Sequence, residues 1–317
     1  MKKQLLPYLV AVLTLIACEK EITVDLPRTD PKIVVEGTIE TGRPPLVLLT
    51  RTQNYFDPTS IESIAGSYIS DAVVTIYDGN NTITLDRICS SSIPDDQLEA
   101  VAAAVGIDVN LLRQANICAW TKLDNTLLGQ EGRTYRLDVQ AEGNTLTSTT
   151  TIPGAVALDS LWFKLAQNNP GDDTLGFLWG TLSDPDTIGN AYRWFAQRIN
   201  RDDDGVPKDS RFLAPSFSAF EDRYVNGLTF DFSYNRGSEP FGGDDPEAGY
   251  YKVGDTVVVK FASMGTAEYR FYNSFANNVA TQGDVFSNPA NVRSNIEGGL
   301  GIWAGLGVRL DTVICVP

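Results

Sequence analysis

The stretch Tyr135–Pro153, YRLDVQAEGNTLTSTTTIP, decides the fold of this chain, because polar and apolar residues alternate along it on both sides of Glu142-Gly143-Asn144. Alternation with a period of two is typical of half-buried strands, and a glycine-containing turn between two such runs predicts a β-hairpin. A second hairpin is predicted where Asp78-Gly79 separates the runs Ala72–Tyr77 and Thr82–Leu85, since Asp-Gly supplies the positive φ that a tight turn needs. The chain is therefore expected to be mainly β.

Strand-like runs continue in both directions from these hairpins, from Ile33–Ile39 near the start to Tyr192–Ile199 and beyond. A chain of 317 residues exceeds what one hydrophobic core usually organises, so two domains are expected. Residues 32–155 are predicted to form an immunoglobulin-like β-sandwich of short antiparallel strands. Residues 156–317, where aromatic residues concentrate, are predicted to form a second antiparallel β domain, either a sandwich or a flattened barrel.

A helical insertion interrupts the first domain between two cysteines. Residues 90–117 are rich in alanine and leucine, and acidic residues stand at the start of each expected helix. Cys89 and Cys118 flank this insertion, and in an exported protein a disulfide between them is the simplest interpretation, with two buried free thiols as the alternative. Cys315 is left without an evident partner.

The N-terminal segment is predicted to export and anchor the chain. Two lysines precede an apolar run that is too short to cross a bilayer as a helix, and residues 1–17 are therefore interpreted as a signal peptide. The run ends in Leu15-Ile16-Ala17-Cys18, which resembles a bacterial lipobox, where the cysteine is acylated and becomes the mature N-terminus. Residues 18–31 would then form a lipidated tether. The alternative is an ordinary signal peptide in which Cys18 is incidental.

The charge of the mature chain excludes some partners. Removal of residues 1–17 takes away two of the 25 Lys and Arg residues and none of the 40 Asp and Glu residues, which leaves a net charge of −17. A strongly acidic protein lacks the positive surface that neutralises phosphates, so a nucleic-acid partner is not expected. The same charge disfavours electrostatic adhesion to anionic lipid, so attachment to a membrane has to come from the lipid on Cys18.

Catalytic chemistry is not predicted from the sequence. The chain contains no histidine, which removes Ser-His-Asp and Cys-His catalysis and His-ligated zinc. The stretch Gly299-Leu300-Gly301-Ile302-Trp303-Ala304 formally fits a dinucleotide fingerprint, but no apolar strand precedes it, so its glycines are expected to let a strand pack closely. The chain is expected not to be an enzyme, and no cofactor and no firm metal site are predicted.

Two further patterns are candidate ligand sites. Asn200, Asp202 and Asp204 place oxygen ligands at alternate positions as in a calcium loop, although Arg211 stands where an EF-hand needs a glutamate. The alternative for this stretch is a solvated Asp-Gly hairpin tip. A β core explains most of the aromatic residues, and the alternative for those on expected loops is a surface that stacks on sugars or peptides, formed by Phe241, Tyr250, Tyr251 and Phe286.

Several stretches along nearly the whole chain carry a family resemblance. They are Ile22–Pro27, Pro31–Gly37, Gly132–Leu137 with Thr151–Pro153, Val225–Gly227 and, most specific of all, Asn288–Trp303. Together they resemble a Bacteroidota outer-membrane lipoprotein family known as domain of unknown function 4249. The resemblance implies an accessory lipoprotein encoded beside a TonB-dependent outer-membrane receptor, and it implies no catalytic residues. Glu19-Lys20-Glu21 also resembles the surface-export signals of this phylum.

These features predict a lipid-anchored, non-enzymatic protein of the outer membrane, displayed on the cell surface. Its expected role is to work with a TonB-dependent receptor in binding or passing on a nutrient. The alternative is a structural or assembly protein that mediates protein contacts at the outer membrane.

Overall fold

The hairpin expected around Glu142 and Gly143 is present in the computed structural model of the chain, as strands β7 (Thr134–Ala141) and β8 (Asn144–Thr151). Glu142 and Gly143 have φ angles of 52° and 77°, the left-handed conformation that a two-residue hairpin turn requires. The structure describes residues 30–54, 60–167, 172–202, 204–238, 247, 249–281 and 291–317. The expected signal peptide, lipobox and export signal lie outside these residues.

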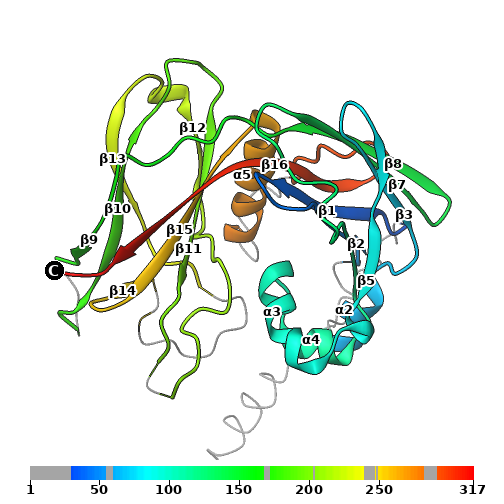
Figure 1. Cartoon of the computed structure of the whole chain (residues 1–317), viewed down its shortest axis with the longest axis horizontal. Helices are drawn as coiled ribbons and strands as arrows, with labels where there is room; N and C mark the ends of the chain where they lie inside the picture. Colours follow the sequence, from blue (N-terminus) through cyan, green and yellow to red (C-terminus); the bar gives the residue numbers. More distant parts are fainter. Residues whose placement is uncertain are drawn as a thin grey trace, which may run out of the picture. The chain divides into compact units, whose positions relative to one another are not determined.

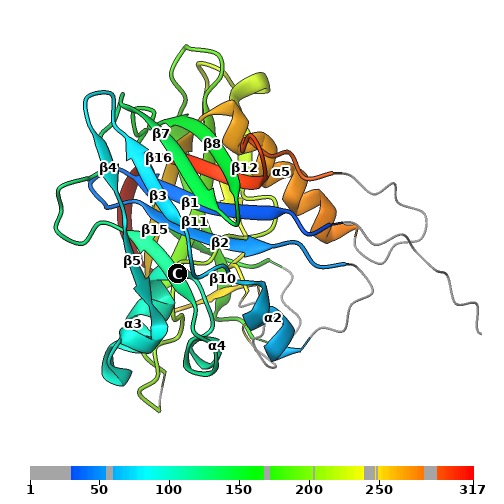
Figure 2. The ribbon, with the colours of Figure 1, turned by 90° about the vertical axis from the view of Figure 1, so that its right-hand side faces the viewer.

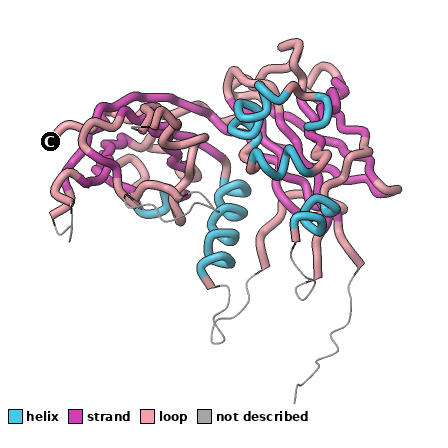
Figure 3. Tube along the Cα trace, turned by 90° about the horizontal axis from the view of Figure 1, so that it is seen from below, coloured by secondary structure: helices cyan, strands magenta, loops and turns pink. Residues whose placement is uncertain are grey.

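Three sheets account for the strands of the described residues, so the chain is mainly β, as predicted (Figures 1 and 3). The largest sheet has eight strands, in the order β12 (Ala219–Glu221), β11 (Ala191–Arg198), β15 (Thr256–Met264), β16 (Leu300–Ile314), β1 (Ile33–Glu40), β2 (Leu46–Arg51), β6 (Cys118–Thr121) and β5 (Asp86–Cys89). The second has the order β4 (Thr82–Thr84), β3 (Val73–Tyr77), β7 and β8. The third contains β13 (Thr229–Tyr234), β10 (Leu175–Ser183), β14 (Tyr251–Lys252) and β9 (Ser160–Leu165).

Two hydrophobic cores lie between these sheets. One half of the large sheet packs against β3, β7 and β8 through residues such as Val35, Trp120 and Leu137, and Figure 2 shows this second sheet in front of β1 and β2. The other half packs against β9, β10 and β13 through an aromatic cluster that includes Trp194 and Phe261. The immunoglobulin-like arrangement of residues 32–155 stays a prediction.

Strand β16 is shared by both cores. Its first part pairs in parallel with β1, from Leu300 opposite Val34 to Leu306 opposite Glu40, and its second part pairs antiparallel with β15. Trp303 is fully buried in the first core, where its Nε1 donates to the carbonyl oxygen of Tyr135 at 3.1 Å. Residues 31–317 form one compact unit, and the predicted boundary between residues 155 and 156 stays a prediction.

The glycines of the stretch at 299–304 permit close strand packing, as the sequence indicated. Gly301 has a φ of 109°, and a Cβ atom there would lie 1.9 Å from the carbonyl oxygen of Val35 on β1. No side chain fits at that distance, so the parallel pairing of β16 with β1 requires glycine at this position.

The predicted helical insertion and its disulfide are both confirmed. Helices α3 (Asp95–Val105) and α4 (Val109–Gln114) lie between β5 and β6, after a 3₁₀ turn at Ser90–Ser92. Cys89 and Cys118 are paired across these two strands and form a disulfide. The thiol of Cys315 is free and buried.

Two helices were not predicted. Helix α2 (Ile61–Ser67) begins at Ser60, whose side chain accepts a hydrogen bond from the backbone N–H of Ser63. Helix α5 (Thr266–Ala280) follows β15, and its N-terminal Gly265 provides no side-chain cap. No helix among the described residues is long and apolar enough to cross a membrane.

Candidate functional site

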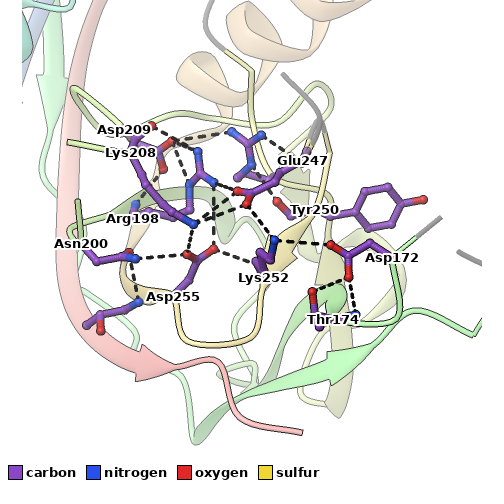
Figure 4. A network of polar contacts seen from close by, with 12 residues as sticks. Asp172, Thr174, Arg198, Asn200, Lys208, Asp209, Glu247, Tyr250, Lys252 and Asp255 are labelled. Atoms are coloured by element: carbon purple, nitrogen blue, oxygen red, sulfur yellow. Dashed lines mark hydrogen bonds and ion pairs between the residues drawn. The ribbon is translucent and has the colours of Figure 1, made fainter. Parts of the chain in front are cut away.

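A network of charged side chains lies at the end of the second core, where β11 ends and β15 begins (Figure 4). Arg198 donates through Nη2 to Oδ1 of Asp209 at 2.8 Å and through Nη1 to Oε2 of Glu247 at 2.5 Å. Lys208 Nζ lies 2.8 Å from Oδ1 of Asp255. The side chains of Arg198, Asp209 and Asp255 are only 5%, 2% and 1% exposed. The network therefore joins several loops and strand ends in the protein interior.

The charges in this network stabilise one another. Burial works to lower the pKa of Arg198, but the hydrogen bonds and charge of Asp209, with the charges of Asp255 and Glu247, outweigh it and raise that pKa. The pKa of Lys208 is raised in the same way, against burial, mainly by Asp255. Because the ionised groups use their donors and acceptors on each other, this network is best understood as a structural feature of the fold.

A second charged site lies on the face of the eight-stranded sheet that points away from the two main cores. Alternate residues of β1 place Glu36 and Glu40 on this face, since Val35 and Ile39, which point to the opposite side of the strand, are buried in the first core. Arg193 and Phe195 on β11 and Lys260 on β15 share the face by the same alternation. With Tyr272 of α5, they form what is called here the charged strip: Glu36, Glu40, Arg193, Phe195, Lys260 and Tyr272.

Helices cover this face on either side of the charged strip. Helix α5 packs over Ile302, Ala304 and Leu306 of β16, whereas α3 and α4 pack over Leu48 of β2. Leu48, Glu36 and Ile302 lie directly opposite one another on adjacent strands. Glu36 therefore lies on the part of the sheet between the two sets of helices. Figure 1 shows α5 and α3 as separate elements.

The cations of the charged strip lie against aromatic rings. The guanidinium carbon of Arg193 lies 3.8 Å from the centroid of the Tyr272 ring and 4.7 Å from that of Phe195. Lys260 Nζ lies 4.5 Å from the centroid of Phe195 and 2.7 Å from Oε1 of Glu40. Cation–π contacts of this kind hold the side chains in place, and Arg193 also makes a side-chain hydrogen bond with Tyr272.

Glu36 in the charged strip is exposed to solvent and is also closely surrounded by protein atoms. Its side chain is exposed to solvent, and yet burial by the surrounding protein raises its pKa, with the charges of Arg193 and Arg211 opposing the effect. Both statements hold together only where solvent reaches a carboxylate that protein atoms surround closely. Burial lowers the pKa of Arg193 and raises that of Tyr272, so Glu36, Arg193 and Tyr272 are all partly desolvated.

A third polar feature is a hollow of about 610 Å³ on the outer side of α5. It is lined by Arg270, Asn273 and Asn277 of the helix and by Asn291 and Arg293. The last two belong to the stretch that carries the most specific part of the family resemblance. This hollow is separate from the charged strip, because Arg270 and Tyr272 are two residues apart on the helix and face in different directions.

The expected calcium loop is used for hydrogen bonds within the chain. Oδ1 of Asp202 accepts from the backbone N–H groups of Asp204 and Val206 at 3.1 and 2.8 Å. Asn200 donates to Oδ1 of Asp255 at 3.3 Å and so belongs to the buried network. Within the described ranges, no group of three or more Cys, Asp or Glu side chains could hold a metal ion. Calcium binding by this loop stays a prediction.

The prediction of a stacking surface is wrong at Tyr251. Its side chain is fully buried on β14 in the second core, so its ring cannot contact a ligand at the surface. Tyr250 is half-buried, and its ring centroid lies 5.0 Å from that of Phe177. Phe241 and Phe286 lie outside the described residues. The prediction failed because it placed both tyrosines on a loop. Tyr251 lies on a strand, where adjacent residues point to opposite sides of the sheet.

Sequence reasoning missed the charged strip. The sequence does contain a signal for its two carboxylates. Glu36 and Glu40 interrupt an apolar strand and are an even number of positions apart, so they lie on the same face of it. No signal links β1 with Arg193 and Lys260, because β16 from the end of the chain lies between them in the sheet.

Glu268 at the start of α5 fixes this helix to the large sheet and gives a testable pH dependence. Thr150 donates through Oγ1 to Oε1 of Glu268 at 2.5 Å and accepts from the N–H of Gly305 at 2.8 Å. Burial raises the pKa of Glu268 above its usual value, although these hydrogen bonds oppose the shift. A raised folded-state pKa adds stability below the unfolded pKa of about 4.3, and this stability is lost as the pH rises through the folded pKa.

We therefore expect Glu268→Gln to raise the melting temperature relative to the unchanged chain at pH 7 and to have less effect at pH 4. The neutral amide keeps an acceptor for Thr150 and removes the cost of a buried negative charge. Thermal denaturation at both pH values measures the difference. A stabilisation that is equal at the two pH values would show that ionisation of Glu268 is not its source.

By its fold and its charged strip, the chain is a mainly β protein of three sheets with side chains of mixed charge on the face of the largest sheet that points away from the two main cores. The chain belongs to the family described as Domain of unknown function (DUF4249), which matches residues 19–309. The family resemblance of the sequence is thereby confirmed, whereas the phylum, the lipid anchor and the receptor context stay predictions. Among curated proteins, none matches the chain at a significant level.

One solved structure that is similar to this chain is a cycloalternan-degrading enzyme from Trueperella pyogenes in complex with cycloalternan. The TM-score is 0.22 and the sequence identity 9%, over 86% of this chain and 34% of that one. The chain spans about a third of that enzyme's length, and a likeness this low carries no argument about the fold or activity of this chain.

Proposed function

We propose that this chain is a non-catalytic binding protein, anchored to the outer membrane by lipid on Cys18, that works with a TonB-dependent receptor in binding or passing on a nutrient. The observation that carries the binding role is the charged strip, where Arg193 and Glu36 are accessible, partly desolvated and not ion-paired with described residues. Convergent polar groups beside aromatic rings are typical of ligand sites.

Other features support the placement outside the cytoplasm. The disulfide between Cys89 and Cys118 is typical of exported proteins. The sequence before Cys18 resembles a signal peptide with a lipobox, and the acidic chain favours lipid over electrostatic attachment. As part of the same proposal, residues 32–155 form an immunoglobulin-like sandwich, which is supported by the packing of β3, β7 and β8 across a core from β1, β2 and β6.

The anchor gives the first test. We expect Cys18→Ser to move the protein from the membrane fraction into the soluble fraction, because a thiol is required for acylation and no other membrane anchor is proposed.

Replacement of Glu19-Lys20-Glu21 by alanines should lower protease accessibility on intact cells while the protein stays in the membrane fraction. Fractionation and protease treatment of whole cells measure both effects. A Cys18→Ser protein that stays membrane-bound would contradict the lipid anchor.

The partner gives the second test. After mild detergent extraction, the tagged protein should co-purify with a TonB-dependent receptor, and a matched sample with the same tag on an unrelated lipoprotein serves as the control. Recovery of the protein alone, from cells in which the receptor is intact, would count against the proposal.

The alternative of a structural or assembly protein is favoured by one observation. The loops at 184–190 and 222–228 are joined by a hydrogen bond from Asn226 to Asp186, and they expose apolar side chains. Ile188, Tyr224 and Leu228 are 84%, 85% and 53% exposed, as expected of a surface that contacts another protein. Thermal shift with small nutrients separates the two functions, since a nutrient binder is stabilised by its ligand and an assembly protein is not.

A further inference from the structure

We propose that the charged strip binds the two charged termini of a short peptide or of a free amino acid, with Arg193 holding the carboxylate and Glu36 holding the ammonium group. This inference rests on the proposed binding function and names its ligand class. Three observations carry it: the absence of ion pairs at these two residues, their opposite charges on one face of the sheet, and the aromatic rings beside Arg193.

The first observation concerns ion pairing. Among the described residues, no carboxylate lies within ion-pair distance of Arg193, and no Lys or Arg lies within that distance of Glu36. Lys260 and Glu40 on the same face do pair, at 2.7 Å, with both side chains only 14% exposed. Partly desolvated charges without partners are costly to keep, so a ligand that supplies opposite charges gains free energy at both positions.

The second observation concerns the combination of charges. Glu36 and Arg193 lie on the same face of the eight-stranded sheet, and the charge of each acts on the pKa of the other. A lone anion would meet Glu36 and the strongly acidic surface of a chain whose formal net charge is −15. A ligand with one positive and one negative end satisfies both residues and carries no net charge, and free amino acids and peptide termini have this chemistry.

The third observation concerns the geometry around Arg193. Its guanidinium is held 3.8 Å from the Tyr272 centroid and 4.7 Å from the Phe195 centroid, by residues of α5 and β11. A side-chain hydrogen bond with Tyr272 uses part of the guanidinium's donor capacity, and its other N–H groups can donate to a carboxylate. Both rings are half-buried, so their accessible parts can contact an apolar side chain of the ligand.

Binding by the unchanged chain tests the proposal without any substitution. The probes are phenylalanine, the tripeptide Ala-Phe-Ala, and the same tripeptide with an acetylated N-terminus or an amidated C-terminus, measured by isothermal titration calorimetry. We expect the free tripeptide or phenylalanine to bind, and each blocked end to weaken binding about tenfold, because one charge-assisted contact is lost. Binding of phenylalanine as tight as that of the tripeptide assigns an amino acid, and preference for the tripeptide assigns a peptide.

Two substitutions then assign each end. Arg193→Gln should weaken binding of the free tripeptide about tenfold. It should also abolish the difference in affinity between peptides with free and amidated C-termini. Glu36→Gln should abolish the difference between free and acetylated N-termini. The matched controls are Arg270→Gln in the hollow on α5 and Glu99→Gln on α3, both at exposed positions outside the strip, and they should leave binding unchanged. Equal melting temperatures of the variants confirm that they are folded.

The outcomes that overturn the proposal are specific. No binding of phenylalanine or the free tripeptide at millimolar concentration removes it, as does equal binding of free and blocked peptides. If Arg270→Gln abolished binding and Arg193→Gln did not, the ligand would lie in the hollow on α5. That result would also overturn the proposal. Failure here with intact receptor co-purification rejects the ligand class alone, whereas peptide binding without a receptor partner rejects only the accessory role.

Discussion

Arg198→Met is expected to lower the free energy of unfolding by about 3–5 kcal/mol, because it removes one partner from a buried ion pair and leaves the other charge behind. Asp209 is 2% exposed and takes two hydrogen bonds from the Arg198 guanidinium, at 3.1 and 2.8 Å. Its remaining cation, Arg236, is 3.6 Å away. The methionine side chain fills a similar volume, so the loss reports mainly the removal of the Arg198 charge from the buried carboxylates and not a cavity.

Urea denaturation followed by tryptophan fluorescence measures this loss, since Trp194 lies on the same strand as Arg198. Arg201→Met is the matched control, because Arg201 is exposed and its replacement should change the unfolding free energy by less than about 0.5 kcal/mol. Lys208→Met should lower the free energy of unfolding by an intermediate amount. Asp255 loses the Lys208 ammonium group but still accepts a hydrogen bond from the backbone N–H of Lys252 at 2.9 Å. If Arg198→Met were as stable as Arg201→Met, the network would not hold the end of the second core.

Removal of the disulfide by Cys89→Ser with Cys118→Ser is expected to destabilise the chain by about 3–4 kcal/mol in the chain-entropy model. The two cysteines are 29 residues apart, and the loop that they close contains α3 and α4. These helices pack over Leu48 through a small apolar cluster with few fully buried members, so the cross-link should contribute much of their stability. Both cysteines are replaced together so that no unpaired thiol remains.

Reduction of the unchanged chain provides the control, because it opens the same loop without a substitution. The urea midpoint of the reduced chain should equal that of the double variant, and hydrogen exchange should rise first in residues 90–117. A mass that corresponds to two free thiols in the oxidised protein, or a midpoint that does not change on reduction, would contradict the prediction.

Local patterns in the sequence predicted the local structure well. The hairpin at Glu142 and Gly143, the mainly β composition and the helical insertion all follow from residues that are near in sequence. The disulfide follows too, since its cysteines flank one continuous segment. Helix α5 was missed because its identity depends on packing against β16 and β11, not on a cap or on a clear apolar period.

The candidate site could be predicted only in part. Alternation along β1 places Glu36 and Glu40 on one face, and the same rule places Arg193 beside Phe195 on β11. The rule cannot say which strands are neighbours in a sheet. The error at Tyr251 has the same origin, because only the position of β14 beside β10 shows which of two adjacent tyrosines is buried.

Residue types at short and fixed spacings were enough to predict the strand-rich character of the chain, its helical insertion, its disulfide and its family, and the structure and the family match confirm them. The tertiary structure alone decided that β16 crosses from one core to the other and so brings β1 beside β15 and β11. The pairing of strands far apart in sequence depends on how sheets pack and not on any local pattern. The charged strip exists only as a result of that pairing.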